Sequence, residues 1–225
     1  INSDIEHSVL HKTGLFLLDV YIWNRTNPSK KLMFGSYPYP RNFYAQNTIE
    51  FITVFVKDGI PENNLPKKIK EQSKLTQKEW VEFTKQIWNI PIPGKGDMAF
   101  GEHSAIMPEE IVRRCVRLFT FVGDVVLDPF TGSGTTLKVA KELGRNFVGY
   151  EISKSYEDII KLKLGSKWLL FMLKNNQIYN LDCFDFLNKI DDNSINLAVI
   201  DPPYNMSKAD WDTFKSHQAF LDFTY

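Results

Sequence analysis

Apolar residues along this 225-residue chain form two patterns, short continuous runs and runs with a spacing of three or four residues. The short runs are rich in β-branched and aromatic residues, which is typical of buried strands, and the spaced runs predict helices that bury one face. In the second half of the chain, strands are expected at residues 125–127, 147–152, 177–183 and 195–200. Helices are expected to begin at Pro108, Thr135, Ser155 and Phe184. This alternation predicts an α/β fold with a doubly wound, mostly parallel sheet.

The N-terminal part of the chain has a different pattern. Two strongly apolar runs, 15–23 and 48–57, predict strands that pair antiparallel. Three prolines and a glycine within 24–42 predict a long loop between them.

The region after these strands is mostly polar. The lysine-rich stretch 58–75 is expected to be a mobile excursion. Thr76 and Glu79 have the spacing of a capping box and predict a short helix. Prolines and glycines in 87–96 predict extended chain.

Charge is balanced overall, with 27 basic and 27 acidic residues, but it is unevenly distributed. From Val20 to Ile49 the charged side chains are Arg25, Lys30, Lys31 and Arg41. Aromatic residues lie between them, a combination that suits base stacking and phosphate pairing. The alternative is that the rings pack on the protein's own core. From Asp182 onward the sequence contains eight acidic and three basic residues, which indicates either an acidic pocket for a cationic ligand or chance clustering.

The cysteines and histidines give no indication of a metal site. Cys115 and Cys183 lie in apolar surroundings and are interpreted as reduced structural thiols of a cytoplasmic protein. The four histidines are scattered, so no metal is expected. No apolar run approaches the roughly 20 residues of a membrane span, so no membrane partner is expected.

The stretch Val125–Thr136, VVLDPFTGSGTT, has the form of a buried strand, an acid, a glycine turn and the start of a helix. In doubly wound sheets this is the corner that faces a nucleotide, because glycine allows a close approach and the helix start offers free N–H groups. Leu137 stands where a dinucleotide fingerprint would have its third glycine, which disfavours a nicotinamide enzyme.

Four predicted strands end in an acid, at Asp128, Glu151, Asp182 and Asp201. The carboxyl ends of parallel strands share one edge of the sheet, where ligands bind. Asp201 opens the sequence Asp-Pro-Pro-Tyr, in which prolines stiffen a turn that presents carbonyl acceptors. An aspartate, a proline carbonyl and a flat tyrosine together suit an exocyclic amine on a planar base.

These two motifs resemble those of the S-adenosylmethionine-dependent DNA amino-methyltransferases, the N6-adenine and N4-cytosine family found in restriction–modification systems. The stretch from Asp128 to Thr136 is similar to the family's cofactor motif, and the stretch from Asp201 to Tyr204 is similar to the catalytic motif of its adenine-N6 members. The resemblance implies S-adenosylmethionine as cofactor, double-stranded DNA as partner and methylation of a flipped base, most favourably at adenine N6. It also implies a cognate restriction endonuclease, without direct contact.

The resemblance assigns roles to individual residues. The implied catalytic residues are Asp201, Pro202, Pro203 and Tyr204. The implied cofactor-binding residues are Asp128, Phe130, Gly132, Ser133, Gly134, Thr135, Glu151, Asp182, Cys183 and Phe184. The residues expected to contact DNA are Arg25, Lys30, Lys31 and Arg41.

The order of the motifs departs from the family's β arrangement, in which the Asp-Pro-Pro-Tyr portion comes first. We interpret residues 1–165 as the C-terminal portion of one methyltransferase, with target recognition in 24–100 and the cofactor half in 101–165. Residues 166–176 are then a junction, and 177–225 begin a second, tandem copy. A permuted single enzyme is the alternative. Under both interpretations, residues 177–205 are expected to complete the sheet that contains 125–152. One central strand is expected to be missing between 195–200 and the strand pair formed by 15–23 and 48–57.

Other functions stay open from the sequence alone. N4-cytosine methylation by the first half is one, and an inactive cofactor- or DNA-binding fragment is another. An RNA or protein-glutamine methyltransferase is disfavoured, because those enzymes usually carry asparagine where this chain has Asp201.

Overall fold

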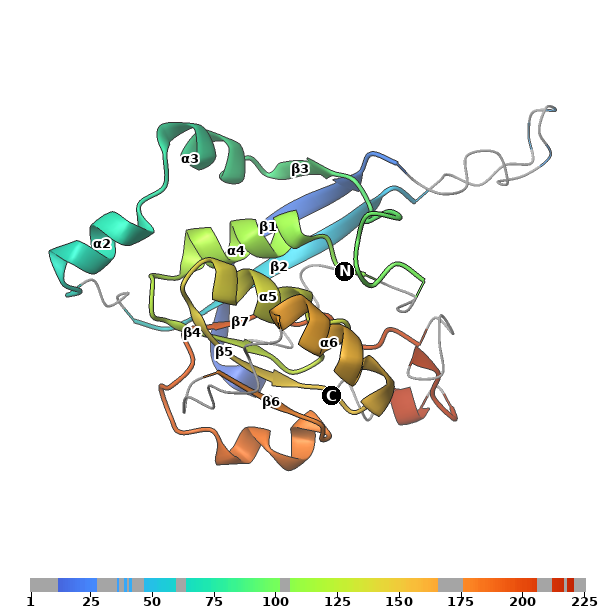
Figure 1. The fold of residues 1–225 in the computed structure, drawn as a ribbon. Helices are drawn as coiled ribbons and strands as arrows, with labels where there is room; N and C mark the ends of the chain where they lie inside the picture. Colours follow the sequence, from blue (N-terminus) through green and yellow to red (C-terminus); the bar gives the residue numbers. More distant parts are fainter. Residues whose placement is uncertain are drawn as a thin grey trace. The chain divides into compact units, whose positions relative to one another are not determined.

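The chain divides into two compact units, Ile1–Ile92 and Pro93–Tyr225. The structure, a computed structural model, describes residues 12–27, 36, 39, 41, 47–59, 64–101, 106–165, 176–205, 212–216 and 218–220. Figure 1 shows the helices and strands of these residues, and the strands form two sheets. Parts of the predicted loop 24–42 and of the predicted junction 166–176 lie outside the described residues.

The first unit contains a three-stranded sheet in the order β2-β1-β3. Its strands are β1 (Leu15–Arg25), β2 (Ile49–Lys57) and β3 (Ile87–Ile90). β1 and β2 pair antiparallel, as the sequence predicts, and β3 adds to β1 in parallel. β1 uses both of its hydrogen-bonding edges within this sheet. That one strand is missing between this pair and the strand expected at 195–200 stays a prediction.

Aromatic side chains anchor β3 to this sheet. The rings of Tyr21 and Trp88 stack with centroids 4.6 Å apart. The indole N–H of Trp23 donates to the carbonyl of Ile90 at 2.8 Å, and that of Trp88 donates to the carbonyl of Phe83 at 3.1 Å. Buried indoles are thus hydrogen-bonded as well as packed, which fixes a strand that composition alone did not predict.

The polar stretch 58–75, predicted to be a mobile excursion, contains the helix α2 (Lys67–Ser73). Pro66 occupies the N-cap position, where its missing N–H is not needed. Ser73 is buried, and its hydroxyl donates to the carbonyl of Ile69 at 2.8 Å.

Helix α3 (Gln77–Phe83) begins with the predicted capping box. The backbone N–H of Glu79 donates to the Thr76 hydroxyl at 3.2 Å, and the Glu79 carboxylate accepts the Thr76 N–H at 2.8 Å. Both bonds satisfy N–H groups that a helix start leaves without an internal partner.

The second unit contains a parallel four-stranded sheet in the order β6-β5-β4-β7. Its strands are β4 (Val125–Asp128), β5 (Asn146–Tyr150), β6 (Asn176–Tyr179) and β7 (Leu197–Ala198). β6 and β7, which come from the downstream part of the chain, therefore flank β5 and β4, the two strands next to the glycine turn. β7 is shorter than the predicted strand 195–200. The predicted α/β fold with a mostly parallel sheet and an antiparallel strand pair is confirmed.

Successive residues of these strands point to opposite faces. Val126 and Phe147 pack on the face covered by α4 (Glu109–Phe119), α5 (Thr135–Glu142) and α6 (Glu157–Leu164). Figure 1 shows these three helices together on that face of the sheet. The core there consists of Val112, Val116, Val126, Leu137, Val139, Ala140, Phe147, Ile160 and Leu164.

The opposite face is covered by two short 3₁₀ turns, η3 (Cys183–Asp185) and η4 (Leu187–Lys189). Leu127, Tyr150 and Cys183 form its buried centre. The sequence predicts one helix from Phe184, and that prediction was wrong because Phe186 has φ −122° and ψ −20°, which interrupts any continuous helix.

Both cysteines are buried free thiols, in agreement with the structural role predicted for them. Burial raises the pKa of Cys115 to about 12, so this thiol is a poor nucleophile. Among the helices of the described residues, none combines the length and the apolar character needed to cross a bilayer.

Gly149 of β5 lies where the strand touches the glycine turn and α5. A Cβ atom at this position would lie 2.6 Å from the Thr131 hydroxyl oxygen and 2.7 Å from Leu137 Cδ1. We expect Gly149→Ala to lower the free energy of unfolding by about 1–3 kcal/mol, because a packed core cannot absorb an added methyl group without shifting. Urea unfolding measures this change. Gly94→Ala is the control, because a Cβ at Gly94 meets nothing within 4 Å, and equal losses in the two variants would contradict the prediction.

Candidate active site

The acids predicted to follow the strands gather at one edge of the parallel sheet. β4 ends at Asp128, and Glu151, Asp182 and Asp201 come shortly after β5, β6 and β7. β4 pairs with β7 in the register Val126 to Leu197, so the chain after β4 and the chain after β7 leave the sheet as neighbours. The carboxyl ends of these four strands therefore surround one site.

Asp128 is the most deeply buried acid of this site, with 5% of its surface exposed. Its carboxylate accepts the N–H of Phe130 at 3.0 Å. Burial raises the pKa of Asp128 to about 7, and the nearby carboxylates of Asp201 and Glu151 add to the rise.

The glycine turn is held in a left-handed backbone conformation. Gly132 has φ 51° and Gly134 has φ 82°, values that favour glycine over any residue with a side chain. Gly134 is also the N-cap of α5, so the helix begins directly at the turn. The N–H of Thr131 donates to the carbonyl of Tyr150 at 2.9 Å and ties the turn to β5.

Glu151 connects this turn to the end of β5. One carboxylate oxygen accepts the N–H of Gly132 at 2.7 Å, and the other accepts the N–H of Ser153 at 2.8 Å. Burial raises the pKa of Glu151, and these two backbone donors lower it in part. A carboxylate has about four acceptor positions, so Glu151 can still accept hydrogen bonds from a ligand's hydroxyl groups.

The segment after β6 lies beside Glu151. The side-chain amide of Asn180 donates to the carbonyl of Glu151 at 2.8 Å. Asp182 caps the next turn by accepting the N–H of Phe184 at 3.0 Å, and Cys183 is buried behind it. The ring of Phe184 and the side chain of Ile152 are 53% and 64% exposed, so apolar groups border the carboxylates.

The Asp-Pro-Pro-Tyr segment follows β7, and its first and last side chains, Asp201 and Tyr204, are exposed. The N–H of Tyr204 donates to the carboxylate of Asp212 at 2.7 Å, and Asp212 itself is 1% exposed. The N–H of Phe214 donates to the Asn205 side chain at 3.2 Å. Asp212 lies outside the sequence motifs, yet it anchors the backbone of the predicted catalytic segment.

Two of the four predicted DNA contacts can be located. Arg25 pairs with Glu50 at 3.0 Å and also donates to the carbonyl of Asn47, so its guanidinium is engaged within its own sheet. Arg41 is exposed, with φ 79°. Lys30 and Lys31 lie outside the described residues.

Lys163, which is buried beside the glycine turn, and Asp97, which is half-buried, had no place in the sequence interpretation. Lys163 of α6 donates to the hydroxyls of Ser133 and Thr135, both at 3.0 Å, and lies 3.6 Å from the carboxylate of Asp97. Ser133 and Thr135 are themselves buried, so their hydroxyls face the protein interior. Their role in holding a cofactor stays a prediction.

Known proteins share this architecture. A solved protein of Thermus thermophilus, described as a DNA modification methylase complexed with S-adenosyl-L-methionine, matches 80% of this chain and 63% of its own, with 30% identity and a TM-score of 0.58. The type II methyltransferase M.MjaI of Methanocaldococcus jannaschii is 39% identical over 157 residues, which are 69% of this chain and 52% of the relative.

A shorter match has higher identity. The type II methyltransferase M1.MboII of Moraxella bovis is 61% identical over 54 residues, 24% of this chain and 21% of the relative. The chain thus spans about half the length, or less, of these curated relatives. The model of the N6_N4_Mtase family, described as DNA methylase, matches residues 2–162. The chain belongs to this family of DNA methylases.

Proposed function

We propose that the protein transfers a methyl group from S-adenosylmethionine to an exocyclic amine of DNA, at adenine N6. The observation that carries this proposal is the parallel pairing of β4 with β7, because it brings the glycine turn and the Asp-Pro-Pro-Tyr segment to the same edge of one sheet. A methyl donor and an acceptor amine must meet in line, and neighbouring strands provide adjacent sites for them.

The residues at this edge fit an adenosine group. Glu151 can accept hydrogen bonds from ribose hydroxyls, because its two backbone donors leave acceptor positions open. The exposed side chains of Ile152 and Phe184 offer apolar surfaces to a planar ring, and Asp182 can accept a hydrogen bond from its amine. The glycine turn, with Asp128 and Phe130, would form the floor. S-adenosylmethionine would supply an electrophilic methyl group.

The Asp-Pro-Pro-Tyr segment would receive the target base. The carboxylate of Asp201 and the carbonyl of Pro202 would accept hydrogen bonds from the exocyclic amine and orient its lone pair. Tyr204 would stack on the flipped base, and Pro203 would limit the movement of the turn. The bond from the Tyr204 N–H to Asp212 supports this arrangement by fixing the backbone. The target must leave the duplex, because its amine cannot be reached within the stack.

DNA recognition would lie in residues 24–100, with Arg25, Lys30, Lys31 and Arg41 near phosphates. Because Arg25 is paired with Glu50, it would have to exchange this partner for a phosphate. We further propose a role in a restriction–modification system in the cytoplasm. The proposed tandem arrangement, with 1–165 from one copy and 177–225 from the next, rests on the order of the motifs.

The proposed function is tested by methyl transfer to DNA. The purified chain and the open reading frame from which it comes are each incubated with duplex DNA and methyl-labelled S-adenosylmethionine, and the nucleosides are separated after digestion. We expect N6-methyladenine. N4-methylcytosine would place the chain among cytosine enzymes, and cofactor binding with no labelled nucleoside from either preparation would favour a non-catalytic binding module.

Glu151→Gln should weaken S-adenosylmethionine binding by about tenfold or more. Each carboxylate oxygen of Glu151 now accepts a backbone N–H, and the glutamine NH₂ group would place a donor opposite one of these two N–H groups. Calorimetric titration gives the dissociation constants. Glu157→Gln is the control, since Glu157 lies on the exposed surface of α6 and pairs with Lys161. Unchanged affinity in Glu151→Gln would remove Glu151 from the cofactor site.

A further inference from the structure

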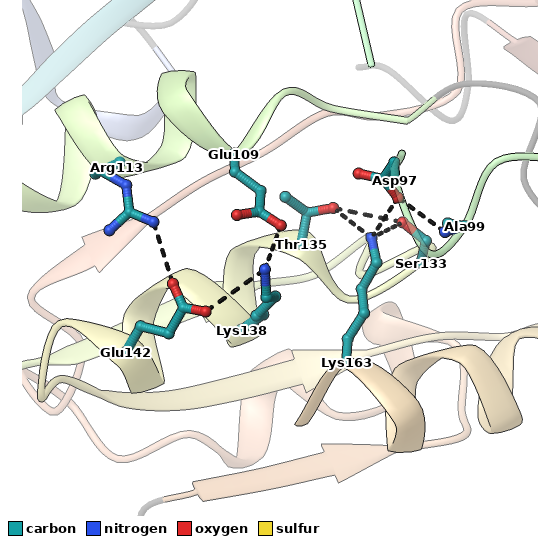
Figure 2. Close-up of polar contacts among 9 residues, drawn as sticks. All are labelled: Asp97, Ala99, Glu109, Arg113, Ser133, Thr135, Lys138, Glu142 and Lys163. Atoms are coloured by element: carbon teal, nitrogen blue, oxygen red, sulfur yellow. Dashed lines mark hydrogen bonds and ion pairs between the residues drawn. The ribbon is translucent and has the colours of Figure 1, made fainter. Parts of the chain in front are cut away.

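A buried ammonium group, that of Lys163, joins three segments of the chain: helix α6, the glycine turn and the turn around Asp97. Lys163 Nζ lies 3.0 Å from the hydroxyl oxygens of Ser133 and Thr135, and 3.6 Å from a carboxylate oxygen of Asp97. Figure 2 shows these contacts converging on the end of the lysine side chain. The side chain of Lys163 is 1% exposed, so its ammonium group takes its partners, two hydroxyls and one carboxylate, from inside the protein.

Such a group is unfavourable unless it is paired. Moving an ammonium ion out of water costs several kcal/mol, so buried lysines occur with partners that hold them in place. Burial lowers the pKa of Lys163, and the carboxylates of Asp97 and Glu109 partly oppose this effect. The arrangement therefore depends on Asp97, and it limits the positions that the attached segments can take.

The first segment that Lys163 limits is the glycine turn. Ser133 and Thr135 stand on either side of Gly134, whose φ of 82° sets the direction in which α5 begins. A Cβ at Gly134 would lie 3.3 Å from Ile160 Cγ1, one turn before Lys163 on α6. Helix α6 thus contacts the turn at its glycine and holds the hydroxyls on both sides of it.

The second segment is the turn around Asp97, before α4. Asp97 accepts the N–H of Ala99 at 2.8 Å through the same carboxylate oxygen that faces Lys163. Its own N–H donates to the carbonyl of Gly94 at 2.9 Å, and its carbonyl accepts the N–H of Phe100 at 3.0 Å. These bonds make a closed turn, and the ion pair with Lys163 attaches it to the glycine turn.

A separate network joins the helices nearby. Lys138 of α5 pairs with Glu109 of α4, and Glu142 of α5 accepts from Arg113 at 3.1 Å. Figure 2 shows this network beside the Lys163 contacts. It holds α4 against α5 through ion pairs that do not include Lys163, although the charges of Glu109 and Lys138 also act on Lys163.

We propose that Lys163 and Asp97 are positioning residues of the cofactor site, which hold the glycine turn and the Asp97 turn together in the conformation that binds S-adenosylmethionine. This inference rests on the proposed function. A preorganised turn binds its ligand more tightly, because less conformational freedom is lost on binding. The pair acts before the chemical step, so it sets the affinity for the cofactor and not the rate of methyl transfer at saturation.

The test compares Lys163→Met and Asp97→Asn with Lys161→Met. Lys161 is on the same helix and pairs with Glu157 at the surface, so its loss controls for a missing lysine in α6. We expect Lys163→Met and Asp97→Asn each to weaken S-adenosylmethionine binding roughly tenfold, with KM for the cofactor raised equally and kcat little changed. The double variant should lose less binding free energy than the two single variants together, since both changes break the same interaction.

The outcomes separate this inference from the function itself. Absence of cofactor binding by the unaltered chain would overturn the proposed function. The inference would be overturned if Lys163→Met bound the cofactor as tightly as the unaltered chain does. It would also be overturned if the losses of binding free energy were additive in the double variant. Asp97→Asn keeps the two hydroxyl contacts of Lys163, so it remains informative if Lys163→Met fails to fold. Loss of kcat without a change in KM would also contradict a positioning role.

Discussion

Replacing Asp201 with alanine is expected to reduce methyl transfer to DNA on the order of 1000-fold, with S-adenosylmethionine affinity nearly unchanged. The side chain is exposed at the sheet edge, so its removal leaves no cavity in the core. Its proposed contact is with the target amine and not with the cofactor. The loss should therefore appear in kcat and in kcat/KM together.

Asp201→Asn separates charge from hydrogen bonding. The amide keeps one acceptor oxygen for the amine but loses the negative charge, so we expect an intermediate loss of roughly 10- to 100-fold. Asp192→Ala is the matched control, because Asp192 is an exposed acid in the turn before β7. Labelled nucleosides after a timed reaction give the rates.

Full activity of Asp201→Ala would refute the catalytic assignment. In the longer open reading frame the same result would also follow if an Asp-Pro-Pro-Tyr segment of the other tandem copy performed the reaction. Comparing Asp201→Ala in this chain with Asp201→Ala in the open reading frame distinguishes the two cases, because this chain has a single Asp-Pro-Pro-Tyr segment.

The elements around the site were predictable because their signals are local. The strand, acid and glycine turn of Val125–Thr136 occupy one short stretch, and their form follows from β-branched residues and glycine conformations. The capping box of α3 is equally local, since Thr76 and Glu79 are close in sequence. The short η3 and η4 turns were mistaken for a helix because their apolar spacing resembles helical spacing over a few residues.

Contacts between distant segments were harder to predict. The pairing of β3 with β1 depends on buried indoles whose partners, such as Ile90 for Trp23, lie far along the chain. Hydrophobic periodicity gives the buried face of each element but not its neighbours. The addition of β3 to the sheet of the first unit could therefore not be predicted from the strand patterns alone.

The role of Lys163 had a weak sequence signal. Ile159, Ile160, Lys163 and Leu164 share one face of the predicted helix by their spacing, and all four are buried. A lysine on an apolar helix face must either reach solvent or find an internal partner. That pattern indicates a buried cation, but it does not identify Asp97, which lies far away in sequence within a turn of ordinary composition.

Asp128→Asn should change how stability depends on pH. The carboxyl of Asp128 has a pKa raised from an ordinary value of 3.8 to about 7, chiefly by burial. Between these values the folded chain keeps the proton that the unfolded chain releases. The contribution of Asp128 to the free energy of unfolding therefore falls as pH rises from about 4 to about 7, and stays low above pH 7.

The size of this effect follows from the pKa difference. One pKa unit corresponds to 1.36 kcal/mol, so the contribution lost by pH 8 is about 4 kcal/mol at most. Asparagine is a neutral replacement of similar shape, and its carbonyl oxygen can still accept the N–H of Phe130. We expect Asp128→Asn to be more stable than the unaltered chain at about pH 8 and similar to it at about pH 4.

Urea unfolding at a series of pH values, without cofactor, measures both curves. Glu151 also has a raised pKa and contributes with the same sign, so the difference between the two curves is the quantity that reports on Asp128. Asp192→Asn, a change at an exposed acid, should leave the curve of the unaltered chain in place. Parallel curves for Asp128→Asn and the unaltered chain across this range would mean that Asp128 is already ionised at low pH. The buried carboxylate would then have to be stabilised by the Phe130 and Thr136 hydrogen bonds more strongly than burial opposes it.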